Sequence, residues 1–239
     1  MSDPSRAVPA FSAPDRITVV SGLPRAGTSL LMQILEAAGL EIARDDMRPP
    51  DPDNPRGYFE LAAVKAIRRD AGFVDACVGR VVKIVAPLVP DLPRERAYRF
   101  LVVERDLGEI LASQRAMLRR LARSAASDAE DAALARAYQA ANARARAWIA
   151  AAPDAPALFV AHAELLASPA GESERIADFL EGTGAAAAAS AASRPAPGRE
   201  AESEREPAAA EERRIRRRTT VAAMSAVVDP RLYRCRAGS

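Results

Sequence analysis

The sequence RITVVSGLPRAGTS, residues 16–29, joins a β-branched apolar run to a turn that contains two glycines. A helix-compatible segment, residues 28–38, follows this turn and ends at Gly39. A short apolar run that ends in a glycine turn and continues as a helical pattern predicts a strand, a tight turn and a helix. This unit indicates that the chain folds as an α/β protein.

The same alternation of strand and helix patterns continues along the chain. Apolar runs predict further strands at residues 80–85, 98–104 and 158–161. Helical patterns cover residues 61–71, 107–123, 128–151 and 172–180. Because strands alternate with helices, we expect an α/β fold of the three-layer P-loop type, with a central, mostly parallel sheet flanked by helices.

Composition divides the chain into four parts. Residues 1–15 contain three prolines and no long apolar run, which predicts a disordered leader before an α/β domain at residues 16–182. Residues 183–210 are mainly Ala, Ser, Pro, Glu and Arg without a large apolar side chain, which is typical of a low-complexity linker. A basic helix and tail are predicted over residues 211–239. Its arginines are expected to form a solvated helix face, and the alternative is that they supply positive charge to a bound phosphate.

Charge and residue usage exclude several classes of function. The chain has 34 basic and 32 acidic residues, so we expect a small-molecule, glycan or peptide partner, and neither nucleic acid nor a membrane. A single histidine excludes a multi-histidine metal site, and no metal is expected. Cys77 and Cys235 are far apart and no signal peptide is recognisable, which together predict a reducing, cytoplasmic location. The oligomeric state is left open.

The turn itself has the composition of a phosphate-binding loop. GLPRAGTS, residues 22–29, has the glycine spacing of a Walker-type loop, but Thr28 stands where that loop has its lysine. A strand that leads through such a turn into a helix directs backbone N–H groups and the positive helix end at one point, which suits a phosphate. Arg25 can supply the missing charge, and Thr28 and Ser29 can donate hydroxyl hydrogen bonds. The alternative is a turn that needs glycine for steric reasons alone.

Two segments together resemble the sulfotransferases. Pro24-Arg25-Ala26-Gly27-Thr28-Ser29 is similar to the loop that binds the 5′-phosphosulfate in that family. In the same family an arginine at a strand end and a serine eight residues later bind the 3′-phosphate of 3′-phosphoadenosine-5′-phosphosulfate. Arg105 follows the predicted strand 98–104, and Ser113 lies eight residues on. The alternative is that Arg105 caps the sheet and Ser113 faces solvent.

The resemblance implies roles for two further residues. Lys83, in Val81-Val82-Lys83-Ile84-Val85-Ala86-Pro87, is similar to a catalytic lysine of the family, but Val85 stands where the family has a catalytic histidine. His162 stands at the position of a tyrosine that contacts the adenine. Three roles stay open for His162, in decreasing order of preference: an adenine contact, a core residue and a general base.

The general base has to come from elsewhere in the chain. Glu60 ends the long polar segment 44–60 and is the first candidate, because some sulfotransferases resemble this arrangement in using a glutamate. Its alternative role is that of a surface carboxylate at the start of a helix, where the helix dipole favours acids. Asp45 and Asp46 are reserve candidates.

The resemblance therefore implies an enzyme that transfers a sulfuryl group from this donor to a hydroxyl or amine of an unknown acceptor, with Arg25, Lys83 and Glu60 as catalytic residues. One alternative is a regulatory or scaffold protein that binds the nucleotide without turnover, which Val85 would fit. The other is a P-loop kinase, for which the loop lysine is absent and Glu104 is the available Walker-B acid.

Overall fold

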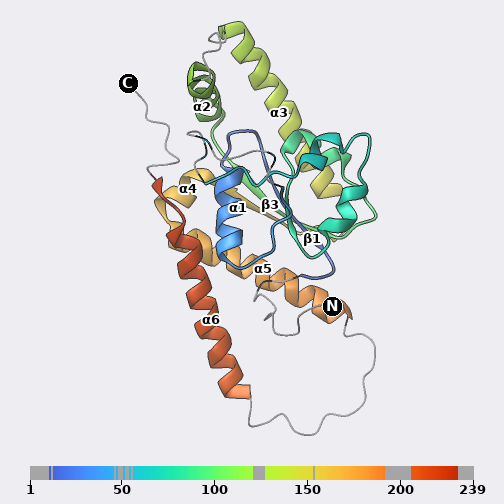
Figure 1. Ribbon diagram of the computed structural model, residues 1–239, viewed down its shortest axis with the longest axis vertical. Helices are drawn as coiled ribbons and strands as arrows, with labels where there is room; N and C mark the ends of the chain where they lie inside the picture. The colour runs from blue at the N-terminus through green and yellow to red at the C-terminus, as the bar shows by residue number, and fades with distance from the viewer. Residues whose placement is uncertain are drawn as a thin grey trace.

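The fold is built on a four-stranded parallel sheet with the strand order β2-β1-β3-β4. The strands are β1 (Ile17–Gly22), β2 (Val81–Lys83), β3 (Tyr98–Glu104) and β4 (Ala157–Ala161). The computed structural model describes residues 11, 13–45, 47, 51, 54, 56–120, 127–152, 154–191 and 206–230, and the side chains of these except for residues 128, 183–191 and 206–209. Helices flank the sheet, so the three-layer α/β fold with a parallel sheet is confirmed (Figure 1).

The central strand β1 is buried along its whole length. It pairs in parallel with β2 on one side and with β3 on the other, so that Val19 lies between Val82 and Phe100. A strand covered on both faces gains from apolar side chains on both sides, which explains the apolar pair Val19-Val20 in β1 and the apolar run 100–103 in β3.

Neighbouring side chains of β3 show which helices cover each face. The rings of Tyr98 and Phe100 pack on Trp148 of α3 (Asp128–Ala151), with ring centroids 5.8 Å apart in both pairs. Arg99, between them, faces the other side, where it reaches Leu180 of α5. The second face is covered by α1 (Thr28–Ala37), α5 (Pro169–Ala191) and α6 (Glu206–Ala226), with α6 alongside α1 in Figure 1.

The structure corrects several predicted boundaries. The helix expected at 61–71 is replaced by a single 3₁₀ turn, η1 (Ala62–Ala66). A second 3₁₀ turn, η2 (Gly72–Cys77), follows beyond this range and was not predicted. Helix α5 continues through Gly182 to Ala191, into the predicted linker, because the alanines that follow have the highest helix propensity. Helix α6 starts at Glu206, before residue 211.

Three further elements complete the chain, of which two were not predicted from the sequence. Helix α2 (Leu107–Arg120) was expected, and its predicted last residues, 121–123, lie outside the described residues. The short helix α4 (His162–Ala167) and the 3₁₀ turn η3 (Ala86–Asp91) were not expected. In the part of the chain that the structure describes, no helix is long and apolar enough to cross a membrane.

A fully buried arginine ties the sheet to both ends of the domain. The Arg99 guanidinium donates hydrogen bonds to Thr18 Oγ1 at 2.7 Å, to the Phe11 carbonyl at 2.8 Å and to the Leu180 carbonyl at 3.2 Å. Burial, and secondarily the charge of Arg16, lowers the pKa of Arg99 to about 10, so it stays protonated at neutral pH. Since Phe11 is also buried, the packed domain begins before residue 16, inside the predicted leader.

We expect Arg99→Met to lower the free energy of unfolding by about 3 kcal/mol, because three buried acceptors lose their donor. Urea unfolding followed by circular dichroism measures the loss. Arg96→Met is the matched control, because Arg96 is exposed and paired with the exposed Asp75, and its loss costs less than about 1 kcal/mol. Equal losses in the two variants would contradict the structural role of Arg99.

Candidate functional site

Predicted site residues stand at or just after the end of each of the four strands. Strand β1 ends at Gly22 and leads into the predicted loop residues 24–29, Lys83 ends β2, Arg105 follows β3 and His162 follows β4. The strands are parallel, so these positions share one edge of the sheet. The chain passes from β1 to β2 on one side and from β3 to β4 on the other, which puts a topological switch point between β1 and β3. Open parallel sheets bind their ligands at such a point.

The loop between β1 and α1 has the backbone geometry of an anion-binding turn. Arg25 and Gly27 have left-handed φ values of 70° and 108°, and the Ala26 N–H donates to the Leu23 carbonyl at 3.0 Å. Gly27 is the N-terminal cap of α1 and has no side chain to bond the first N–H groups of the helix. Those N–H groups and the helix dipole suit a bound phosphate.

The remaining loop side chains differ in exposure. Pro24 and Ser29 are half-buried, whereas Ala26 and Thr28 are buried. The Thr28 methyl lies 3.2 Å from the position that a Cβ on Gly22 would take, so this side chain packs back toward β1. The loop therefore presents its backbone and the side chains of Arg25 and Ser29.

His162 packs directly against this loop. A Cβ on Gly27 would lie 2.5 Å from His162 Cδ2, so a glycine is required at this position. His162 is 2% exposed, and burial, with a smaller contribution from the charge of Arg105, lowers its pKa to about 4. The ring is therefore neutral at pH 7 and supports the loop; its contact with an adenine stays a prediction.

Arg25, Arg105, Glu109 and Ser113 form the arginine cluster, in which the loop meets α2. Arg25 Nε donates to Ser113 Oγ at 3.0 Å, and Arg105 Nη1 donates to the Arg25 carbonyl at 3.2 Å. Arg105 Nε also pairs with Glu109 Oε2 at 2.8 Å. Ser113 is buried and does not face solvent, so that alternative is wrong. The two residues predicted to bind a 3′-phosphate thus lie at one place, beside the loop.

Ser29, Tyr58, Glu60 and Lys83 form the lysine cluster at the other end of the loop. Lys83 Nζ donates to the Tyr58 carbonyl at 2.8 Å and to Ser29 Oγ at 3.2 Å. Glu60 Oε1 lies 3.8 Å from the same nitrogen. The Lys83 side chain is 7% exposed, so its charge acts at close range on Ser29, with little screening by water. The cluster places a cation and a carboxylate together beside the first turn of α1.

The contacts of Glu60 differ from those of a carboxylate that caps a helix. The N–H of Ala62, which opens η1, donates to Asp45 Oδ2, so Asp45 supplies the cap of this turn. Glu60 instead lies between Lys83 and Lys65, 3.8 Å from each nitrogen. Asp46, the other reserve base, lies outside the described residues.

The two clusters divide residues that the sequence had grouped. Arg25 and Lys83 were both predicted to act on the sulfuryl group. In the structure, Arg25 donates a hydrogen bond to Ser113 of α2, whereas Lys83 donates one to Ser29. Sequence reasoning missed Glu109 and Tyr58. The spacing of four between Arg105 and Glu109 on a predicted helix was a usable signal for their pairing, whereas the Tyr58 contact is made by a backbone carbonyl and leaves no trace in the sequence.

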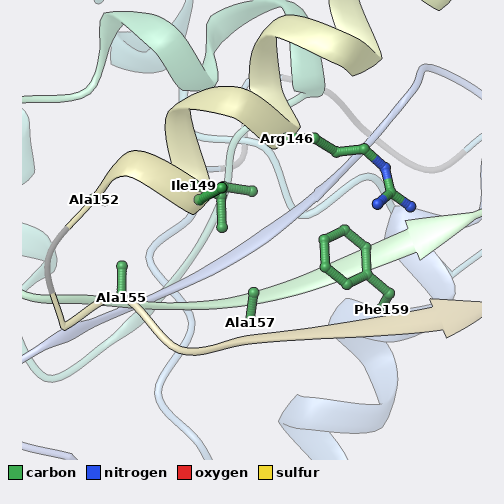
Figure 2. A pocket seen from close by; sticks show the side chains of 7 residues that line it. Arg146, Ile149, Ala152, Ala155, Ala157 and Phe159 are labelled. Atoms are coloured by element: carbon green, nitrogen blue, oxygen red, sulfur yellow. The ribbon is translucent and has the colours of Figure 1, made fainter.

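A separate cavity of about 380 Å³ lies between α3 and β4. Figure 2 shows Arg146 and Ile149 of α3 above Ala157 and Phe159 of β4. The Arg146 guanidinium stacks 4.2 Å from the Phe159 ring centroid and pairs with Glu104. The lining contains none of the predicted site residues, and the cavity lies on the face of the sheet covered by α3.

No protein-family model matches the chain, and no curated protein matches it. Inference about its function therefore depends on the residues and contacts described above.

The lowered pKa of His162 predicts a pH-dependent stability. The unfolded chain takes up the proton at about pH 6.5 and the folded chain at about pH 4, so the free energy of unfolding falls as the pH falls between these values. The full effect is about 3 kcal/mol. Denaturant unfolding at pH 7 and pH 4 should show that His162→Gln loses this part of the pH dependence. A variant with the wild-type pH dependence would contradict the burial of a neutral ring.

Proposed function

We propose that the chain is a sulfotransferase that moves a sulfuryl group from 3′-phosphoadenosine-5′-phosphosulfate to a hydroxyl or amine acceptor. The observation that carries the proposal is the arginine cluster: Arg105 and Ser113, 8 residues apart in sequence, meet Arg25 of the loop through side-chain and backbone hydrogen bonds. Two guanidinium groups and a buried hydroxyl beside a helix N-terminus suit a dianionic phosphate. The resemblance seen in the sequence assigns the 3′-phosphate to these same residues.

The presence of a charged cluster at each end of the loop suits a donor with two separate anionic groups. The arginine cluster would bind the 3′-phosphate, while the N–H groups of residues 26–29 at the start of α1 would bind the 5′-phosphosulfate. The lysine cluster then adjoins the reacting end of the nucleotide, because Lys83 is bonded to Ser29 in the first turn of that helix. A nucleotide bound in this way spans both clusters.

In the proposed reaction the acceptor oxygen or nitrogen attacks the sulfur in line with the leaving phosphate. A bond from the acceptor to sulfur forms, the bond from sulfur to the phosphate oxygen breaks, and 3′-phosphoadenosine 5′-phosphate leaves. Lys83 stabilises the negative charge that develops on the leaving oxygen. Glu60 takes the acceptor proton as general base. This step uses no metal ion, and the absence of a metal and the cytoplasmic location remain predictions from the sequence.

A second candidate function has one observation in its favour. Val85, at the position of the family's catalytic histidine, follows β2 in an extended conformation and leads into η3. If Glu60 does not take over the role of this histidine as general base, the chain would bind the nucleotide without turnover and act as a regulatory or scaffold protein. Sulfate transfer to a mixture of small-molecule, glycan and peptide acceptors separates the two: binding of the nucleotide without turnover favours the regulatory function.

Arg105→Ala should weaken the binding of 3′-phosphoadenosine 5′-phosphate about 10- to 150-fold, because a charge-assisted hydrogen bond to the 3′-phosphate is lost. The affinity for adenosine 5′-phosphate, which has a 3′-hydroxyl, should fall far less. Isothermal titration measures both affinities, and Arg115→Ala is the control, since Arg115 lies on α2 and pairs with Asp131. Equal losses for the two nucleotides would refute the assignment of the 3′-phosphate. Magnesium-dependent activity with ATP would instead indicate a kinase.

Glu60→Gln should lower turnover by about 10²–10⁴-fold, the usual contribution of a general base, with nucleotide affinity nearly unchanged. The pH profile of turnover should also lose its acidic limb. Glu41→Gln is the matched control, because Glu41 is an exposed carboxylate paired with Arg80. A parallel loss of stability, binding and activity would show that Glu60 is a structural residue.

A further inference from the structure

Glu109 forms an ion pair with Arg105, the arginine that is proposed to bind the 3′-phosphate of the nucleotide. Its carboxylate oxygen Oε2 lies 2.8 Å from Arg105 Nε, four residues earlier in the chain. The Arg105 side chain is 7% exposed, whereas the Glu109 side chain is 54% exposed. The pair therefore joins a buried guanidinium to a carboxylate that can move into solvent without breaking the packing around it.

A carboxylate on a guanidinium makes the same charge-assisted hydrogen bonds as a phosphate. The Arg105 guanidinium already uses Nη1 to donate to the Arg25 carbonyl and Nε to donate to Glu109. A 3′-phosphate that approaches this group meets the negative charge of Glu109 at the same nitrogen. Glu109 lies in the first turn of α2, where the helix dipole favours a negatively charged side chain. The arriving phosphate has to displace this side chain or accept its repulsion.

We propose that Glu109 competes with the 3′-phosphate of the nucleotide for Arg105 and so sets the affinity for 3′-phosphorylated nucleotides and the rate of product release. The inference rests on the proposed function and deepens it, because it names a specificity-determining residue of the same site. A nucleotide with a 3′-hydroxyl carries no charge to compete for Arg105 and leaves the pair intact. Glu109 therefore reduces the advantage that the 3′-phosphate gives.

The opposite role for Glu109 would be to hold Arg105 in its binding position. The two roles predict opposite effects when the carboxylate is removed. A competitor weakens nucleotide binding in the wild type, so its removal tightens binding. A positioning residue strengthens nucleotide binding in the wild type, so its removal weakens binding. Arg105 has other anchors, because it also donates to the Arg25 carbonyl and its side chain is buried. These contacts favour the competitor.

Glu109→Gln tests the inference by isothermal titration with 3′-phosphoadenosine 5′-phosphate and with adenosine 5′-phosphate. We expect the 3′-phosphorylated nucleotide to bind about three- to tenfold more tightly, because the carboxylate that competes for Arg105 is gone. Adenosine 5′-phosphate should bind as to the wild type. In an Arg105→Ala background the gain should disappear, because the two residues act as one unit. Dissociation of the 3′-phosphorylated nucleotide in a stopped-flow chase should slow by the same factor as the affinity rises.

Glu104→Gln is the matched control. It removes a carboxylate one residue before Arg105, but that carboxylate pairs with Arg146 of α3 on the other face of the sheet. A similar gain in this variant would mean that overall charge, and no specific competition, sets the affinity, and would overturn the inference. Unchanged or weaker binding by folded Glu109→Gln would overturn it as well. If the wild type binds neither nucleotide, the proposed function fails first, and the inference fails with it.

Discussion

Four parallel strands end at one edge of the sheet, and the rest of the site depends on this constraint. A parallel strand has to be followed by a crossover, so each strand leaves through a loop or helix at the same edge. Here those exits hold the glycine turn, Lys83, Arg105 and His162. Gly27 and His162, which are 135 positions apart in the sequence, therefore meet at this edge. At the switch point between β1 and β3, the segments that follow these two strands lead away in opposite directions, which leaves room for a ligand between them.

Within that edge, the turn after β1 is held from two sides. The ring of His162 at the start of α4 packs against Gly27, and Arg105 after β3 donates to the carbonyl of Arg25. These contacts fix the turn in its left-handed conformation, which a chain of L-residues adopts at a cost. The turn therefore has a fixed conformation and a charged cluster at each end. The arginine cluster lies where the turn meets α2, and the lysine cluster lies where it meets β2. Such a division suits a donor whose bound phosphate and reacting group are separate.

Much of the fold follows from local patterns, whereas the pairing inside the site does not. The strand at 98–104 and the helix at 128–151 were predicted with their observed ends from their apolar patterns. The structure adds a capping box of Ser127 with Glu130 at the start of that helix. The helix expected at 61–71 was wrong, since Asp45 caps a 3₁₀ turn there from 17 residues away. Buried Arg99 was not identified, because a charged residue inside a strand gives no sign of distant carbonyl partners. The hydrogen bond between Arg25 and Ser113 spans 88 residues, so motif spacing gave no sign that these two side chains touch.

We propose that one nucleotide spans both clusters at the carboxyl edge of the sheet. Hydrogen–deuterium exchange with and without 3′-phosphoadenosine 5′-phosphate can show this, because it reports which amides a ligand protects without assuming any role for a residue. With the nucleotide bound, we expect slower exchange in two separate segments, the turn and first helical residues at 24–29 and the start of α2 at 105–113. Protection confined to the cavity between α3 and β4, or no protection at a saturating nucleotide concentration, would contradict it.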